Sequence, residues 1–448
     1  MYLYGCQQVL LHPDSELKAI LEFICQQANS LTNCGIYYAR QLYFKAQKII
    51  GKYDLESEYK GNKHYKALHS QAAQQVLRSV AESFESFKKL KSAFLSKKIA
   101  DKPRAPKYRK SGGFAVVSYP KQALRLFNNK IRIPLGRQVK CWFGLDYFFV
   151  LKPSNLKFAD IKELRILPRN RCFYAEFVYK ISVIEVDVDK GNVLGVDTGI
   201  NNWMTCVSNV DTSFIVDGRH VKSLNRWYNK LVSTLKENKP QGFWSNRLAA
   251  ITEKRNRQMR DAINKAARLV ISHCLEHRIA TVVFGWNSGQ RQKVELGKTT
   301  QSFVQIPTAR LKERISQLCQ HYGIHFVETE EANTSAASFL DGDIPYKYGE
   351  RPEDWKSSGR RVKRGLFRTA QNLYINADAN GAANIIFKVA TTLGLDLSRV
   401  GRGVLTRPQR IKLWSAKSIK RSGRCGTRSL EPEGDSSHRD LSCHVASV

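Results

Sequence analysis

The spacing of hydrophobic residues changes twice along the chain and divides its first half into two regions. Between residues 12 and 101, apolar residues recur every three or four positions, which predicts helices over about 15–28, 36–50 and 70–94 and hence a small helical domain. From residue 112 to about 186 the pattern changes to short runs rich in Val, Ile, Phe and Tyr, which are typical of β-strands. These runs predict a compact β-barrel or sandwich, and we expect an early strand over 2–11 to belong to it.

A buried strand that ends in an acid opens the second half of the chain. Val193 and Leu194 lead into Asp197, and a glycine turn follows at once. Two further short strands are expected over 204–207 and 214–216. A ribonuclease-H-like sheet begins with three consecutive strands of this kind and carries an acid on the first. A turn-capping aspartate is an equally open interpretation of Asp197.

The remaining pattern alternates helices and strands before it fades. Residues 219–278 read as basic helices, 281–284 as a buried strand, and 325–328 as another strand after an intervening helix. A last helix begins near residue 376 and carries Asp378 in its first turn. Beyond about residue 401 the periodicity is lost, so we expect 401–448 to form a basic, largely disordered tail.

The net charge of the chain restricts the classes of molecule that it is expected to bind. Its 448 residues include 73 Lys and Arg against 39 Asp and Glu, a formal net charge of +34. The positive electrostatic field of such a chain favours binding to a polyanion. A membrane surface is the competing partner, but the basic residues are spread through all segments instead of lining one amphipathic helix, and no apolar run is long enough to cross a bilayer. Nucleic acid is therefore the expected partner.

The cysteines and the first residues of the chain indicate the cellular compartment of the protein. The ten cysteines contain no C-x2-C pair, so they offer no zinc knuckle, and they suit a reducing cytosol. The first residues lack the basic start and cleavage site of a secretory leader, and we expect a cytoplasmic protein.

Six basic residues are candidates for contact with nucleic acid. One lies on the polar face of the third predicted helix, two in a basic connector with two prolines over 102–110, and three in the basic helical stretch. For the connector, a solvated linker is an equally open interpretation. The candidates are Arg78, Lys107, Arg109, Arg255, Arg257 and Arg260.

Carboxylates in the second half could hold divalent cations. Asp197 and Asp378 with one more acid would bind two Mg²⁺ about 4 Å apart, the arrangement that hydrolyses phosphodiesters. Gly285 stands where the next strand ends and cannot be a ligand; the nearest acids are Glu330 and Glu331. Two structural interpretations stay open. Asp378 could only stabilise the N-terminus of its helix through the helix dipole, and Glu330 and Glu331 could only form a solvated turn.

Five motifs carry a family resemblance, and the pairing of the third with the fifth is the most specific. They lie at 33–41, 70–74, 195–199, 364–367 and 376–382. On these motifs the chain resembles the TnpB (OrfB) proteins of insertion sequences, RNA-guided DNA nucleases related to type V CRISPR effectors. The resemblance covers nearly everything up to about residue 400.

The resemblance implies a multidomain α+β fold. A wedge β-barrel over 1–11 and 102–188 would be split by a helical recognition domain over 12–101. A RuvC nuclease domain of ribonuclease-H-like α/β fold would follow over 189–400, and the tail over 401–448.

The chain departs from the family at two points. Most members carry a glutamate where Gly285 stands, and two Cys pairs that form a zinc ribbon before the last aspartate motif. Here 285–289 and 330–335 resemble a subgroup whose glutamate has moved, which implies Glu331 as the relocated ligand and Glu330 as the fallback. No cysteine lies between residues 336 and 368, so no zinc is expected.

The function implied is that of an RNA-guided DNA endonuclease encoded by a transposable element. Asp197, Glu331 and Asp378 would bind two Mg²⁺. The partners would be a guide RNA transcribed from the element end and a double-stranded DNA target beside a short flanking motif, with no membrane. The alternatives are a nuclease-inactive RNA-guided repressor and a protein-only RuvC-like nuclease or transposition accessory; a DDE-type transposase is less favoured.

Overall fold

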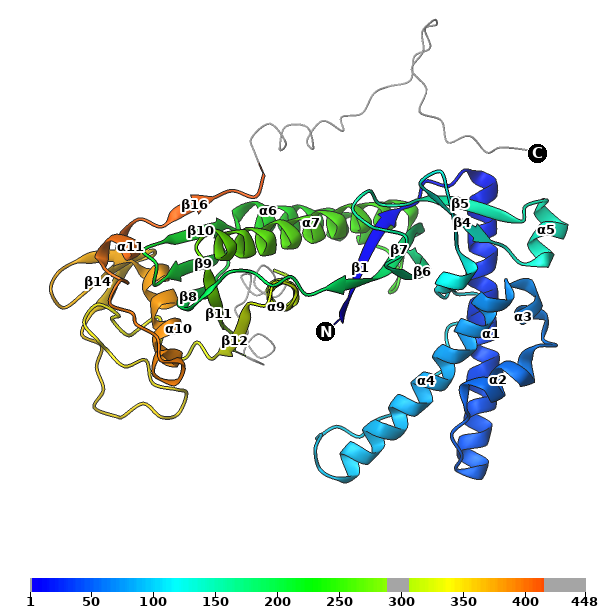
Figure 1. Cartoon of the computed structure of the whole chain (residues 1–448), viewed down its shortest axis with the longest axis horizontal. Helices are drawn as coiled ribbons and strands as arrows, with labels where there is room; N and C mark the ends of the chain where they lie inside the picture. The colour runs from blue at the N-terminus through cyan, green and yellow to red at the C-terminus, as the bar shows by residue number, and fades with distance from the viewer. Residues whose placement is uncertain (1, 288–305, 415–448) are drawn as a thin grey trace, which may run out of the picture.

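The computed structural model describes residues 2–287 and 306–414 of the chain. The fold mixes helices with several sheets. The molecule is elongated, with helices α1 to α4 and a small sheet at one end and a six-stranded sheet at the other (Figure 1). The long helix α7 (Asn246–Glu276) runs between the two ends.

The first sheet joins the start of the chain to residues far along it. It has the order β1–β7–β6–β2 and is antiparallel throughout. Strand β1 pairs with β7 from Tyr2 opposite Ser182 to Leu10 opposite Tyr174, so the helices that follow β1 are inserted between two strands of one sheet. The strands are β1 (Tyr2–Leu10), β2 (Val117–Pro120), β6 (Ile161–Arg169) and β7 (Cys172–Ser182).

A separate three-stranded antiparallel sheet lies beside the helices. It has the order β3–β4–β5, and the short helix α5 connects its last two strands. Side chains alternate along these strands, and Ile131, Ile133, Phe148 and Val150 point into the core. The elements are η1 (Lys121–Ala123), β3 (Arg125–Phe127), β4 (Lys130–Pro134), α5 (Arg137–Phe143) and β5 (Tyr147–Leu151).

The helical region contains one fewer break than the hydrophobic pattern predicts. The two helices expected over 15–28 and 36–50 are a single helix, α1 (Ser15–Ala46). Its polar middle is satisfied without a break, because Thr32 donates to Ala28 O and Asn29 donates to Lys110 O in the basic connector. The other helices are α2 (Lys52–Tyr59), α3 (Lys63–Ala67) and α4 (Ser70–Leu95).

The six-stranded sheet has the order β12–β11–β8–β9–β10–β16. Strands β8, β9 and β10 form an antiparallel meander, and β11, β12 and β16 add to its two sides in parallel with their neighbours. The strands are β8 (Asp189–Thr198), β9 (Asn202–Ser208), β10 (Ser213–Asp217), β11 (Ile279–Gly285), β12 (His325–Thr329) and β16 (Gln409–Ile411).

Helices cover both faces of this sheet. Leu194 and Val196 of β8 pack in one apolar cluster with α7 and α9, whereas Val193 packs on the other face with Ile385 and Ile386 of α10. Alternation along β8 therefore directs Asp197 toward α10. The remaining elements are α6 (Arg219–Lys236), α9 (Thr308–His321), β13 (Arg360–Lys363), β14 (Leu366–Arg368), β15 (Tyr374–Asn376), α10 (Ala377–Leu393) and α11 (Arg402–Thr406).

The disordered tail expected from residue 401 is wrong for its first part. Residues 402–406 form α11, Leu405 is fully buried, and β16 pairs with β10 from Gln409 opposite Phe214. The reason is tertiary: the outer side of β10 offers backbone groups to pair, and a three-residue strand is too short to show a period. Residues 415–448 of the expected tail lie outside the described residues.

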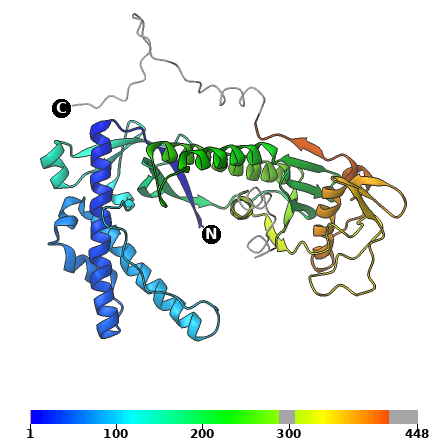
Figure 2. The same ribbon diagram turned by 180° about the vertical axis from the view of Figure 1, so that it is seen from behind.

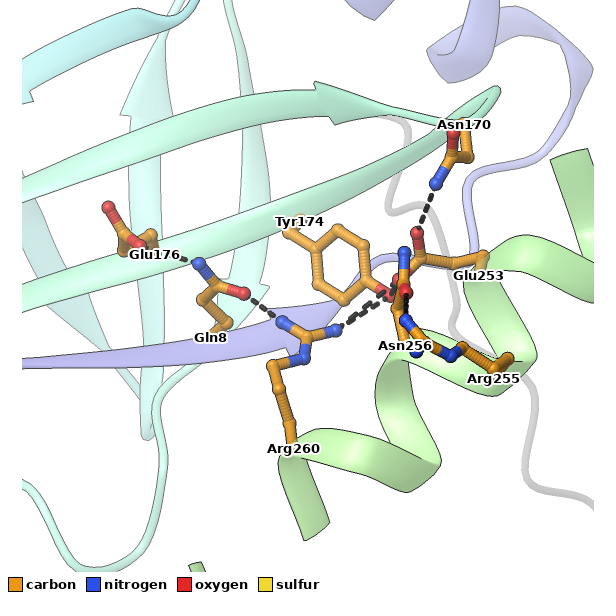
Figure 3. Close-up of polar contacts among 8 residues, drawn as sticks. All are labelled: Gln8, Asn170, Tyr174, Glu176, Glu253, Arg255, Asn256 and Arg260. Carbon is orange, nitrogen blue, oxygen red and sulfur yellow. Dashed lines mark hydrogen bonds and ion pairs between the residues drawn. The ribbon is translucent and has the colours of Figure 1, made fainter. Parts of the chain in front are cut away.

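A polar cluster ties α7 to the first sheet (Figure 3). Glu253, almost fully buried on α7, accepts hydrogen bonds from Tyr174 OH, from Asn170 and from Arg260 at 3.3 Å. The Arg260 guanidinium also donates to Gln8 of β1 and, at 3.3 Å, to Tyr174 OH of β7. One arginine thus links a helix of the second half to two strands of the first sheet.

We expect Arg260→Ala to lower the free energy of unfolding by about 2 kcal/mol, because it removes the cation that partners a buried carboxylate. Arg257→Ala is the matched control, since Arg257 is exposed on the same helix and should stay within about 0.5 kcal/mol of the wild type. Urea unfolding followed by circular dichroism measures both. Equal values for the two variants would contradict the structural role of Arg260.

No helix within residues 2–287 and 306–414 combines the length and the apolar character that a membrane span requires.

Candidate functional site

Asp197 lies near the end of β8, against helix α10. A Cβ atom built on Gly381 of α10 would be 3.0 Å from Asp197 Oδ2, and one built on Gly195 would be 2.5 Å from Ala382 O. The absence of side chains at these two glycines allows α10 to lie directly on the strand and on its carboxylate. This close contact explains why a glycine stands at position 195 of β8 and at position 381 of α10.

Glu331 occupies the space above Gly285. A Cβ built on Gly285 would be 2.9 Å from Glu331 Cγ and 3.1 Å from Glu331 Oε1. Glu331 N donates to Asn287 Oδ1 at 2.9 Å, and Thr198 Oγ1 lies 3.3 Å from Glu331 Oε1. The carboxylate of Glu331 therefore sits beside the end of β8, over the strand end that lacks an acid of its own.

Glu330 points into a different environment. Its carboxylate pairs with Lys388 Nζ at 2.9 Å and accepts from Tyr348 N at 3.1 Å. Burial raises the pKa of Glu330, but the hydrogen bonds from Lys388 and Tyr348 outweigh it, and the pKa is below its usual value. The structure thus engages the fallback residue in a local ion pair, whereas Glu331 lies with Asp197.

Asp378 is in the first turn of α10. The side chain of Asn376 caps the helix by accepting from the backbone N–H groups of Asp378 and Ala379, at 3.0 Å each. The Asp378 carboxylate accepts from Asn202 at 2.6 Å and pairs with Arg361 at 3.2 Å. Both oxygens are thus held by side chains of other elements, which a role confined to the helix dipole does not require.

The other two acids act electrostatically on Asp197. The pKa of Asp197 is raised well above its usual value, first by burial and then by the negative charges of Glu331 and Asp378. Arg361 offsets part of this effect. The structure therefore brings together the three acids that sequence reasoning selected. In the described part of the chain, however, no three His, Cys, Asp or Glu side chains are placed so that they could hold a metal ion as they stand.

Two asparagines on α10 connect this helix to the segment after Glu331. Asn380 and Asn384 are fully buried, and both donate to Ala337 O at 2.7 Å. Asn384 also donates to Thr334 O at 2.9 Å, and Asn380 accepts from Phe339 N at 3.0 Å. Sequence analysis selected neither asparagine. The signal was two polar residues one helical turn apart on an otherwise apolar helix face.

Hydrogen bonds to one carboxylate fasten the segment that follows Glu331. Asp343 accepts from the backbone N–H groups of Ser338 and Ser358, at 2.8 and 2.9 Å, and from the hydroxyl of Ser357 at 3.3 Å. The segment then leads into the sheet β13–β14–β15, which presents Arg361 to Asp378.

A cleft of about 770 Å³ opens beside Asp197 and Asp378. Its wall is strongly basic, so it can attract a phosphate backbone to the edge of the acidic group. The basic residues that line it are Arg219, Arg361, Lys363, Arg364 and Arg410. Sequence reasoning selected none of them as contacts. Arg361, Lys363 and Arg364 lie in one basic run over 360–364, whereas Arg219 and Arg410 come from α6 and β16, far from this run in the sequence.

Three of the six predicted nucleic-acid contacts are engaged within the protein. Arg78 pairs with Glu56, Arg255 donates twice to Asn225 Oδ1, at 2.8 and 2.9 Å, and Arg260 belongs to the cluster in Figure 3. Burial lowers the pKa of Arg255. Lys107, Arg109 and Arg257 are exposed and stay predictions.

Comparisons with known proteins give one match to a family model and matches to solved structures. Residues 176–290 match the family model OrfB_IS605, described as "probable transposase". The chain is similar to the protein in a cryo-EM structure of a Cas12f1–sgRNA–target DNA complex, with a TM-score of 0.54, 16% identity and 83% of each chain covered. The mini-RNA-guided endonuclease CRISPR-Cas_phi3 covers 89% of this chain and 93% of its own at 10% identity, but the TM-score of 0.47 is too low to establish a common fold.

No curated protein matches the sequence. The sequence match to the OrfB model and the fold shared with Cas12f1 together support a TnpB-like family for this chain.

Proposed function

We propose that this protein is an RNA-guided DNA endonuclease encoded by a transposable element, and that it cuts its target by metal-dependent hydrolysis next to a short flanking motif. One observation carries the proposal: Asp197, Glu331 and Asp378, which are far apart in the sequence, converge at the end of β8, where burial first and then the charges of Glu331 and Asp378 raise the pKa of Asp197. The basic cleft beside them is the path for the DNA strand.

The proposal includes a division of labour among domains. Residues 189–400, extended by α11 and β16, form the RuvC nuclease domain, and the antiparallel meander β8–β9–β10 with an acid on its first strand supports a ribonuclease-H-like fold. Residues 1–11 and 102–188 form the wedge domain, and 12–101 the recognition domain. The pairing of β1 with β7 supports this insertion. By this division, residues before about 190 read the flanking motif.

The donor chemistry of the site fits Mg²⁺. Carboxylate oxygens are the ligands that hard cations prefer, and Asp197 lies in a negative environment that a cation would relieve. Asp197, Glu331 and Asp378 would hold two ions, and the Arg361 contact to Asp378 would have to give way. Bound Mg²⁺ supplies a polarised water and stabilises the leaving oxygen of a phosphodiester.

The chain's own residues position this acidic group and its substrate. Asn202 and Asn376 fix Asp378, and the asparagines of α10 fix the segment that follows Glu331. The basic residues of the cleft bind phosphates on either side of the bond to be cut. Sequence selection falls to base pairing between guide and target, as in RNA-guided systems generally.

The partners of this reaction are a guide RNA transcribed from the element end and double-stranded DNA. The complex with sgRNA and target DNA formed by the similar Cas12f1 protein supports these partners, and so does the net charge of +34.

Sequencing of the RNA that co-purifies with the protein tests the proposal. The protein is expressed with its flanking non-coding DNA, and we expect one discrete structured RNA whose last segment varies with that DNA. A plasmid that carries the matching sequence should then be cut in the presence of Mg²⁺. Random cellular RNA, or cutting that needs no RNA, would instead favour a protein-only nuclease.

The arginine contact at the site favours a second candidate, a nuclease-inactive RNA-guided repressor. Arg361 pairs with Asp378, and the acids as they stand do not form a cation site among the described residues. A protein of this kind would bind its target and leave the DNA intact, and Glu331→Gln would not change the outcome in cells.

A further inference from the structure

The three-stranded sheet β3–β4–β5 has one face that the proposed nuclease reaction leaves unexplained. Its inner face packs into the core, and an exposed outer face is normally polar. Here Phe127 is 60% exposed and Phe149 is 38% exposed. Apolar rings in water on a sheet are costly unless something covers them, so an exposed group of this kind marks a binding surface.

Aromatic and basic side chains alternate on this outer face. The register places Arg125 opposite Arg132, Phe127 opposite Lys130, and Phe149 on the far side of Arg132. The rings of Phe127 and Phe149 lie 6.0 Å apart with an angle of 30° between their planes. Tyr147 extends the row, with its ring 5.3 Å from that of Phe149. We call these six residues the aromatic face.

The charge of the aromatic face is of one sign. Arg125, Lys130 and Arg132 are exposed, and the Arg132 guanidinium lies 4.1 Å from the centre of the Tyr147 ring. None of the outward positions of these three strands is an acid. Rings that stack bases beside cations that bind phosphates are the means by which proteins hold unpaired nucleic acid.

We propose that the aromatic face binds an unpaired segment of RNA, with successive bases stacked on Phe127 and Phe149 and the backbone held by Lys130 and Arg132. The assignment of this RNA to the guide rests on the proposed function. RNA is favoured over the DNA that is cut, because the sheet lies at the opposite end of the molecule from β8 and α10, which carry Asp197 and Asp378 (Figures 1 and 2). A protein partner would require acids to match three exposed cations, and it is an outcome of the test.

Ultraviolet cross-linking locates the occupant. The full chain is purified with the nucleic acid that it carries, irradiated and digested, and peptides that contain Phe127 or Phe149 are examined by mass spectrometry. We expect adducts with the mass of a ribonucleotide on these peptides. Deoxyribonucleotide adducts, or adducts confined to other peptides, would overturn the proposal.

Substitution separates stacking from simple apolar contact. Fluorescence anisotropy measures binding of the nucleic-acid-free protein to a 12-residue oligouridine. Phe149→Leu keeps an apolar side chain but loses the ring, and we expect affinity to fall about 5–30-fold, in line with about 1–2 kcal/mol per stacked base. Phe149→Trp should bind as the wild type does. Tyr4→Ala, an aromatic residue of β1 that is 65% exposed, is the control and should have no effect.

Each result bears on this proposal separately from the proposed function. Equal binding by the leucine and tryptophan variants would overturn stacking and favour a protein partner, and equal competition by oligothymidine would overturn the choice of RNA. A protein whose aromatic face binds RNA but which cuts no DNA would retain this inference and contradict the nuclease.

Discussion

Asp197→Asn should abolish DNA cutting while binding of the guide RNA and the target stays within about twofold. The charges of both other acids act on this carboxylate, and it lies directly against α10. Loss of a ligand should cost more than the about 10–100-fold that follows from altering a residue behind a metal ligand. Cutting is followed on a target plasmid with Mg²⁺, and binding by electrophoretic mobility shift with a guide–protein complex.

The same substitution has a second expected effect. The folded protein raises the pKa of Asp197, so ionisation of this group opposes folding at any pH above the pKa of the unfolded chain. Asn removes this charge, and the midpoint of thermal unfolding should rise in buffer without metal. A variant that is less stable, or whose binding falls in step with cutting, would show that Asp197 acts as a structural residue.

A matched pair of substitutions at neighbouring positions decides which glutamate serves the site. Glu331→Gln should abolish cutting, because this carboxylate lies beside Asp197 and over Gly285. Glu330→Gln should leave most of the rate, since its partners are Lys388 and the backbone of Tyr348. Both changes are isosteric and remove one charge. The opposite order of effects would assign the ligand role to Glu330.

A stricter version of this test moves the carboxylate from position 331 to position 285. In Glu331→Ala the space above residue 285 is vacant, so Gly285→Glu in that background would present a carboxylate from the strand end itself. The remaining close neighbour is Ile385 Cδ1, 2.5 Å from the new Cβ, and it is the flexible end of a side chain. We expect the double variant to regain part of the cutting that Glu331→Ala loses, in the same plasmid assay.

Local patterns predicted most elements of this protein, because each is encoded within a few residues. The strand that carries Asp197, the strand before Gly285 and the helix that carries Asp378 all appear near their expected positions. The exceptions have tertiary causes. Helix α1 continues through a polar middle because Asn29 finds a partner in the connector, and β16 exists only because β10 is there to pair with it.

The residues of the candidate site also fall into those that local motifs predict and those that only the tertiary fold brings together. The three acids could be selected from motifs, and the structure adds that Glu331 lies at the position that Gly285 leaves open. The basic wall of the cleft could not be assembled from the sequence, since Arg219, Arg361 and Arg410 come from α6, β13 and β16, which are far apart in the chain. Basic residues that the sequence made conspicuous, such as Arg260, instead hold the protein together.

The short strand β16 has a practical consequence for anyone who shortens this protein. Residue 400 is where the hydrophobic pattern fades and where a truncation would be placed from sequence. Removal of the residues beyond it would take away β16 and leave the backbone of β10 unpaired on one side of the sheet. Open edges of this kind recruit strands from other molecules. A chain ended at residue 400 should therefore aggregate, and one ended at residue 414 should stay monodisperse in gel filtration.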